Sequence, residues 1–308
     1  MMVWIAHEAG RELLGELPAG VRVEVCTDAA TWPSDPAKVD FWVPPFLATV
    51  RAADQLAKLP GVRVVQLLSA GADAWTDRVP PGVQLCDARG VHDKPVAEWV
   101  LGAAIGVLRR FPAFARAQER EDWATKQYTP TPELTGKRVL IVGAGSIGRA
   151  IEEHMAPFRV TVTRVARTGR PAEDVHGVDE LARLLPYAEV VVVVVPLTDE
   201  TRGLVDAAFL AAMPDGALLI NAARGPVVDT DALVAELASG RIEAALDVTD
   251  PEPLPGGHPL WQLPGAFITP HTAGSVVGLL PRAYGLVGAQ LRRFAAGEPL
   301  INQVSGGY

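Results

Sequence analysis

The sequence has few cysteines, with only Cys26 and Cys86 among its 308 residues. The two lie far apart in the chain, match no metal-ligand spacing, and fall in the strand-like runs VRVEVC and VQLCD. Disulfide frameworks occur mainly in small secreted chains with several regularly spaced cysteines. We therefore predict two buried, reduced thiols in a cytoplasmic protein, and no metal site.

The sequence also lacks an excess of positive charge and any apolar run of membrane length. Its 36 Asp and Glu residues outnumber 28 Lys and Arg residues, and the net charge of −8 argues against nucleic acid or an anionic membrane as the main partner. The longest helix-like apolar run, Val96 to Leu108, contains Glu98 and is shorter than the about 20 residues that span a bilayer. The opening MMVWIAHEAGRELL has no basic region before an apolar one, so we expect no signal peptide.

The first third of the chain alternates between strand-like and helix-like segments. The strand-like segments are 3–6, 21–26, 39–44, 62–68 and 83–88, and a segment with helical spacing covers 46–59. This alternation predicts a parallel sheet flanked by helices. The small-residue turn Ser69 to Asp73 follows one of these strands and offers accessible backbone amides. Pro95 then begins a helix that is apolar almost all round, which we expect at a domain or subunit interface.

The segment KRVLIVGAGSIGRA at 137–150 predicts a strand, a tight turn and a helix. Gly143, Gly145 and Gly148 follow the strand with GxGxxG spacing. In this motif the first glycine permits the turn, the second leaves room for a pyrophosphate, and the third lets the helix approach the sheet. The helix N-terminus then offers N–H groups to the phosphates, which predicts dinucleotide binding.

The strand expected at 160–165 ends without the acidic residue that binds the ribose hydroxyls of NAD. Ala166, Arg167 and Thr168 stand there instead, with Arg164 and Arg170 close by in sequence. These cations could bind a 2′-phosphate, so we predict that NADP(H) is preferred and that NAD(H) is possible. The alternative is that the arginines are solvated loop residues.

Further strands are expected at 190–195, 217–222, 242–246 and 266–269, with helices at 177–188, 200–216, 231–237 and 276–297. Ligands of doubly wound sheets bind beyond the carboxyl ends of the strands. Three such ends carry reactive side chains: Arg224, the segment from Asp247 to Glu252, and His271.

These segments resemble the D-isomer-specific 2-hydroxyacid dehydrogenases. The motifs VAEWVLGAAIGVLRR, LTGKRVLIVGAGSIGRA, VVVVVPLTDETRGLVD, LLINAARGPVVDTDALVAELASGRI, AALDVTDPEPLPGGHPLW and ITPHTAG follow in the order and spacing of that family. The closing VSGGY is similar to the end of bacterial glyoxylate and hydroxypyruvate reductases. The resemblance implies an α/β fold of two Rossmann-like, doubly wound parallel-sheet domains. A dinucleotide-binding domain at 96–278 would be inserted in a flavodoxin-like substrate domain made of 1–95 and 279–308.

The resemblance also implies site residues and partners. It places the catalytic roles on Arg224, Glu252 and His271, and substrate binding on Ala70 and Gly71 together with Arg224. It implies a homodimer with the helix at 95–110 at its interface. The implied cofactor-binding residues are Gly143, Ala144, Gly145, Ser146, Ile147, Gly148, Arg167, Thr168, Pro196, Thr201, Ala222, Ala223, Asp247 and Ala273.

The three catalytic candidates suit the reduction of a 2-oxo acid. The fork of Arg224 can bind a carboxylate and polarise the neighbouring carbonyl. His271 can supply a proton near neutral pH, and Glu252 can fix its tautomer and favour the imidazolium. We therefore predict a reductase of glyoxylate, hydroxypyruvate or a similar small 2-oxo acid. The residues expected around its pocket are Phe46, Leu68 to Ala72, His92, Trp123 and Arg282.

Other functions remain compatible with parts of this pattern. A non-catalytic dinucleotide sensor on the same fold would bind NADPH without turnover, and a phosphoglycerate dehydrogenase-like enzyme would share the same residues. A short-chain reductase would need a Tyr-x-x-x-Lys pair, which none of the tyrosines forms. A formate dehydrogenase-like enzyme would be expected to lack the acid that Glu252 supplies.

Overall fold

The computed structural model describes residues 1–27, 31–48 and 50–304, and it divides the chain into two compact units. Unit 1 consists of Met1–His92 and Val276–Tyr308, and unit 2 of Asp93–Ser275. The first segment of unit 1 ends at His92 and unit 2 ends at Ser275. Each of these boundaries lies three residues before the expected one, at 95 and at 278. The final residues of the VSGGY segment, 305–308, lie outside the described residues.

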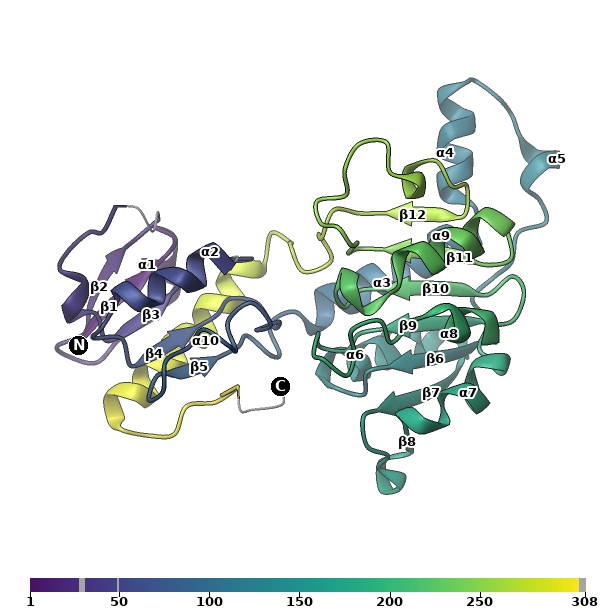
Figure 1. Cartoon of the computed structure of the whole chain (residues 1–308). Helices are drawn as coiled ribbons and strands as arrows, with labels where there is room; N and C mark the ends of the chain where they lie inside the picture. Colours follow the sequence, from purple (N-terminus) through teal and green to yellow (C-terminus); the bar gives the residue numbers. More distant parts are fainter. Residues whose placement is uncertain (28–30, 49, 305–308) are drawn as a thin grey trace. The chain divides into compact units, whose positions relative to one another are not determined.

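Unit 1 contains a five-stranded parallel sheet (Figure 1). Its strands are β1 (Met2–Ile5), β2 (Arg22–Val25), β3 (Phe41–Val43), β4 (Val64–Gln66) and β5 (Gln84–Cys86), in the order β2-β1-β3-β4-β5. This is the flavodoxin-like order, which confirms the predicted architecture. Cys26 and Cys86 are both buried in this unit and are not joined by a disulfide.

Each face of this sheet is covered by its own hydrophobic cluster, because successive strand residues point to opposite faces. On one face Val3 and Ile5 pack with Tyr284 and its neighbours of the last helix, α10 (Leu279–Ala296), while α1 (Gly10–Leu13) contacts the same helix. On the other face Trp4 packs with Trp42 and with residues near α2 (Val50–Ala53). The last helix therefore completes the core of the first 92 residues, in agreement with the C-terminal return segment that the family resemblance implies.

Unit 2 contains a seven-stranded parallel sheet (Figure 1). Its strands are β6 (Arg138–Val142), β7 (Thr161–Ala166), β8 (Val175–Gly177), β9 (Val190–Val193), β10 (Leu218–Asn221), β11 (Glu243–Leu246) and β12 (Ala266–Ile268), in the order β12-β11-β10-β9-β6-β7-β8. The chain runs outward from β6 to β8 and returns to β9 on the other side of β6. This reversal between β6 and β9 is the point at which doubly wound sheets bind dinucleotides.

The helices of unit 2 cover both faces of its sheet. Val190 and Val192 face α3 (Asp93–Leu108) and α6 (Ser146–Met155), whereas Val191 and Val193 face α7 (Leu181–Leu184), α8 (Ala207–Ala212) and α9 (Thr230–Ser239). The uninterrupted valines of β9 are therefore buried on both sides, as a central parallel strand requires. Two further helices, α4 (Phe111–Glu119) and α5 (Thr125–Tyr128), follow α3.

Three of the predicted helices are wrong in extent. The segment 46–59 forms only α2 and a 3-10 turn over Asp54–Lys58, after Pro44, Pro45 and the left-handed Leu47. The segment 200–216 is helical only in α8, because Gly203 turns the chain and Val205 pairs with Val228. Asp206 then caps α8 by accepting a hydrogen bond from the backbone N–H of Phe209. The final helix begins at Leu279 instead of residue 276 and ends at the left-handed Gly297.

Candidate active site

The glycine-rich turn between β6 and α6 contains two glycines that are required by the packing of the backbone. A Cβ on Gly143, whose φ is +124°, would lie 2.6 Å from the carbonyl oxygen of Val194, and a Cβ on Gly148 would lie 2.0 Å from that of Gly143. A Cβ on Gly145 would meet nothing within 4 Å. The space beside Gly145, at the N-terminus of the ten-residue helix α6, is therefore open to a phosphate group.

The arginines in and after β7 differ in how they are held: Arg164 belongs to the strand, and Arg167 and Arg170 follow it. Arg164 pairs with Glu152 at 3.2 Å, and Arg170 donates to the carbonyl oxygen of Ala144 at 3.0 Å. Arg167 lies at the end of the strand with 64% of its side chain exposed, and its Nη1 is 3.2 Å from Glu200 Oε2. Arg164 and Arg170 thus stabilise the fold, and Arg167 is the one of these three arginines that is mainly exposed.

Three neighbouring strands, β10, β11 and β12, end at the same edge of the unit 2 sheet and carry the catalytic candidates. Arg224 follows β10 in a turn fixed by the buried Asn221, whose side chain donates to the Arg224 carbonyl and accepts from the Ala223 N–H. A Cβ on Gly225 would lie 1.9 Å from the carbonyl oxygen of Thr249. The segments that follow β10 and β11 are therefore in close backbone contact.

Glu252 and His271 form a direct side-chain pair. Glu252 Oε1 lies 2.7 Å from His271 Nδ1. The hydrogen bond from His271 is the largest cause that lowers the pKa of Glu252 below 4.5, burial acts in the opposite direction, and the positive charge of Arg224 lowers this pKa further. Because Glu252 occupies Nδ1, the Nε2 atom is the one that His271 can use toward a substrate.

Asp247 holds the turn that carries His271, which is a role that the sequence comparison with the family did not predict. Its carboxylate is 3% exposed and accepts hydrogen bonds from Thr269 Oγ1 at 2.6 Å, Thr272 N at 2.8 Å and Ala273 N at 3.0 Å. Its backbone carbonyl accepts from the His271 N–H at 2.7 Å. Asp247 thus fixes the turn on both sides of His271.

The other predicted cofactor residues lie at the same sheet edge. Pro196 and Thr201 belong to the loop after β9, where Thr201 Oγ1 donates to the Pro196 carbonyl at 2.6 Å. Ala222 and Ala223 follow β10, and Ala273 follows β12. Within unit 2 the structure therefore collects all of them, together with the glycine-rich turn, Thr168 and Arg167, at the carboxyl ends of the strands. Their contacts with a cofactor stay a prediction.

The predicted substrate residues of unit 1 lie at the carboxyl edge of its own sheet. The turn with Ala70 and Gly71 follows β4, and Ser69 Oγ donates to the Gly71 carbonyl at 2.8 Å. His92 Nε2 lies 2.7 Å from the Leu68 carbonyl, and the His92 ring stacks on Phe46 with centroids 5.4 Å apart. Arg282 Nε donates to the Val91 carbonyl at 3.2 Å. Trp123 belongs to unit 2, where it is 94% exposed between α4 and α5.

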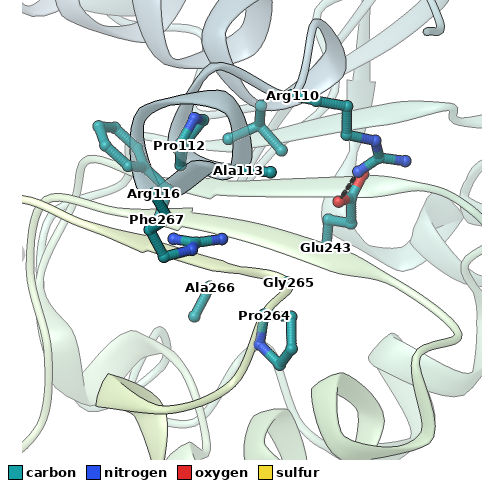
Figure 2. A pocket seen from close by; sticks show the side chains of 10 residues that line it. Arg110, Pro112, Ala113, Arg116, Glu243, Pro264, Gly265, Ala266 and Phe267 are labelled. Atoms are coloured by element: carbon teal, nitrogen blue, oxygen red, sulfur yellow. Dashed lines mark hydrogen bonds and ion pairs between the residues drawn. The ribbon is translucent and has the colours of Figure 1, made fainter. Parts of the chain in front are cut away.

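A small cavity of unit 2 lies at the opposite edge of the sheet. Figure 2 shows Arg110 paired with Glu243, with Arg116 and the start of β12 beside them. Glu243 is the first residue of β11, and burial raises the pKa of its carboxyl. The cavity of about 30 Å³ holds about one water. It is therefore too small, and at the wrong end of the strands, to be the dinucleotide site.

The described residues contain neither a cluster of metal-binding side chains nor a helix that could cross a membrane. Over residues 1–27, 31–48 and 50–304, no three His, Cys, Asp or Glu side chains are grouped to hold a metal ion. No helix in the described part of the chain combines the length and apolar character needed to cross a bilayer.

An added methyl group should have different effects at Gly148, where it would overlap the backbone, and at Gly145, where the space is open. Gly148→Ala is expected to destabilise the protein by about 1–3 kcal/mol, because its Cβ overlaps the Gly143 carbonyl. Gly145→Ala is expected to unfold like the wild type in urea but to bind NADPH at least about tenfold more weakly, a difference of ~1.4 kcal/mol. Wild-type affinity in Gly145→Ala, measured by fluorescence titration, would contradict a pyrophosphate site at this turn.

The Glu252–His271 pair predicts a change in the titration of Glu252. Because the pKa of Glu252 is lowered in the folded protein, the pair is intact above that pKa and is lost as the pH falls through it. In His271→Ala the main cause of the lowering is gone while burial remains, so the pKa of Glu252 should rise. Carbon-13 NMR of the Glu252 carboxyl, with Glu252→Gln to assign the signal, measures this. An equal pKa in both proteins would mean that the pair does not form in solution.

The chain is similar to known proteins over most of its length. The sequence profile described as "D-isomer specific 2-hydroxyacid dehydrogenase, NAD binding domain" matches residues 101–273, more than half of the chain. A glyoxylate reductase of Thermofilum pendens is 34% identical over 80% of this chain and 76% of its own length. A D-3-phosphoglycerate dehydrogenase of Mycobacterium bovis is 32% identical over 84% of this chain and half of its own length.

A solved structure matches both units. The D-isomer specific 2-hydroxyacid dehydrogenase of Xanthobacter autotrophicus Py2, in complex with NADPH and MES, is 34% identical with a TM-score of 0.82, and the match covers 99% of this chain and 97% of that one. Profile, relatives and fold therefore agree, and the chain belongs to the D-isomer-specific 2-hydroxyacid dehydrogenases, a family of NAD(P)-dependent oxidoreductases.

Proposed function

We propose that the protein reduces small 2-oxo acids, such as glyoxylate or hydroxypyruvate, to D-2-hydroxy acids with NADPH as the preferred cofactor. The observation that carries this proposal is the Glu252–His271 pair at 2.7 Å, next to Arg224 at a neighbouring strand end. The glyoxylate reductase of Thermofilum pendens supports the substrate class. The mycobacterial phosphoglycerate dehydrogenase makes 3-phosphohydroxypyruvate the competing substrate to test.

The residues of unit 2 divide the chemistry between them. Arg224 binds the substrate carboxylate and polarises the 2-oxo group through its guanidinium. His271, with Nδ1 held by Glu252, gives the proton on Nε2 to the oxygen as its negative charge develops. Glu252 stays ionised, because its pKa is lowered, and stabilises the imidazolium before that transfer. In unit 1, the backbone amides of Ala70 and Gly71 are proposed as further partners of the carboxylate.

The glycine-rich turn and the end of β7 fit a nicotinamide dinucleotide. Gly145 and the N-terminus of α6 would hold the pyrophosphate, and Arg167 would bind the 2′-phosphate where Ala166 replaces the usual acid. When bound there, a nicotinamide cofactor would supply the hydride for C2 of the substrate, and His271 would supply the proton for the oxygen. The NADPH complex of the Xanthobacter relative supports this preference.

A cytoplasmic homodimer is part of the same proposal. The face formed by α3 and α4 is apolar, with Trp99, Gly102 and Gly106 beside Phe111, which is 57% exposed. A face of this kind suits contact with a second copy of the chain. The two buried cysteines, Cys26 and Cys86, are not joined by a disulfide, which suits a reducing compartment.

The reductase activity is tested by loss of NADPH absorbance with glyoxylate, hydroxypyruvate, pyruvate, phenylpyruvate and 3-phosphohydroxypyruvate. We expect turnover with the small acids, and a fall in kcat of about 100- to 10,000-fold in His271→Ala, because the general acid is removed. NADPH binding to this variant, followed by fluorescence, should persist and serves as the folding control. Binding without turnover in the wild type would favour a sensor, and a preference for 3-phosphohydroxypyruvate would favour a phosphoglycerate dehydrogenase.

The cofactor preference is tested at the Arg167–Glu200 pair. Arg167→Ala should raise the KM for NADPH about tenfold or more and leave that for NADH nearly unchanged, since charged hydrogen bonds contribute ~1.5–3 kcal/mol. Glu200→Gln should lower the KM for NADPH, because it removes a competing negative charge from Arg167. The matched control is Arg183→Ala, since Arg183 is equally exposed at 63% and pairs with Glu180. Equal effects of Arg167→Ala on both cofactors would refute the 2′-phosphate site.

A further inference from the structure

His7 follows β1 at the carboxyl edge of the unit 1 sheet, and neither the family motifs nor the mechanism above uses it. Its side chain contacts Tyr284, a fully buried residue of α10. The two rings meet edge to face with centroids 5.8 Å apart. Gly10 leaves the space for this arrangement, because a Cβ there would lie 2.5 Å from the Tyr284 ring.

The hydrogen bonds of Tyr284 indicate which nitrogen of His7 carries the proton. The His7 backbone N–H donates to the Tyr284 hydroxyl oxygen at 3.2 Å. The same hydroxyl lies 2.9 Å from His7 Nδ1, and burial raises the pKa of Tyr284 to about 12, so the phenol keeps its proton. Because the hydroxyl oxygen already accepts from the His7 backbone N–H, we assign its proton to the hydrogen bond with Nδ1, which then acts as the acceptor. The neutral imidazole then carries its own proton on Nε2.

The neutral form of His7 is also the favoured one, because burial lowers its pKa below 6.5. At neutral pH the ring thus presents one N–H donor, with its other nitrogen occupied by Tyr284. A neutral N–H donor suits a hydroxyl or carbonyl oxygen of a ligand. An anionic group of the ligand, in addition to its carboxylate, would bind more strongly to a cationic side chain.

The strands beside β1 place His7 near the proposed substrate residues. The sheet order puts β3 next to β1 and β4 next to β3. Phe46 follows β3, where it stacks on His92, and the turn with Ala70 and Gly71 follows β4. Two strand spacings of about 4.8 Å separate the ends of β1 and β4. An acid held by its carboxylate at the β4 turn would therefore extend its far end along this edge toward Phe46 and His7.

We propose that His7 is a specificity-determining residue, whose Nε2–H donates a hydrogen bond to an oxygen on C3 of the substrate. This inference rests on the proposed 2-oxo acid reductase function. It selects hydroxypyruvate, which has a C3 hydroxyl, over pyruvate, which has a methyl group there. Glyoxylate has no C3 and gains nothing from His7. Tyr284 is a positioning residue, because it acts only through the tautomer of His7.

The test compares kcat/KM for hydroxypyruvate, pyruvate and glyoxylate in the wild type, His7→Ala and His7→Gln. In His7→Ala the ratio of hydroxypyruvate to glyoxylate should fall about 10- to 100-fold, because a hydrogen bond to the bound substrate is lost. His7→Gln keeps an N–H donor and should restore part of that ratio. If all three substrates fall equally, or the ratio does not change, His7 is a structural residue and the proposal is wrong.

Two further outcomes separate this inference from the proposed function. Nitrogen-15 NMR of the wild type should find His7 protonated on Nε2 and unprotonated on Nδ1, and Tyr284→Phe should give a mixture of tautomers. A proton on Nδ1 in the wild type would overturn the inference while leaving the reductase function intact. A wild-type protein that reduces none of the three acids, with this His7 tautomer present, would instead refute the proposed function and the specificity role that rests on it.

Discussion

The candidate active site depends on the carboxylate of Asp247. This group is almost fully buried, and a buried carboxylate destabilises a fold unless donors surround it. Three donors from the segment 269–273 do so, and the Asp247 carbonyl adds a fourth contact by accepting from His271 N. His271 itself has a φ of +55°, a left-handed conformation that is unfavourable for a residue with a Cβ by roughly 1–3 kcal/mol. The bonds on both sides of His271 make that conformation the stable one.

Close contacts of this kind also hold three neighbouring strand ends together. Asp247 joins the ends of β11 and β12, and Gly225 lets the segment after β10 touch the Thr249 carbonyl. A side chain at residue 225 would separate these segments and move Arg224 away from Glu252. The charge of Arg224 already contributes to the lowered pKa of Glu252. Placement of the reacting groups therefore depends on backbone packing at the sheet edge together with the hydrogen bonds of the Asp247 carboxylate.

The sequence predicted the sheet and the strand ends well because these depend on local patterns. Runs such as Val190 to Val193 have no other stable environment than a buried parallel strand. The prediction of helices failed for the segments 46–59 and 200–216, although both have helical spacing. Prolines and the left-handed Leu47 precede the helix in the first segment, and the bridge between Val205 and Val228 interrupts the second. The partners of Asp247, Arg167 and His7 lie 22–26, 33 and 277 residues away in the chain, so no local pattern reveals them.

The ion pair of Arg167 with Glu200 is compatible with a 2′-phosphate site. Both side chains are about two-thirds exposed, and exposed pairs of this kind contribute only ~0–1 kcal/mol. A guanidinium that binds a phosphate makes charge-assisted hydrogen bonds of ~1.5–3 kcal/mol, so exchange of Glu200 for the phosphate is favourable. Arg164 could not make this exchange as easily, because it is 16% exposed and pairs with Glu152. The exposure of Arg167, more than the number of arginines nearby, is therefore the reason for placing the 2′-phosphate of the proposed cofactor at this residue.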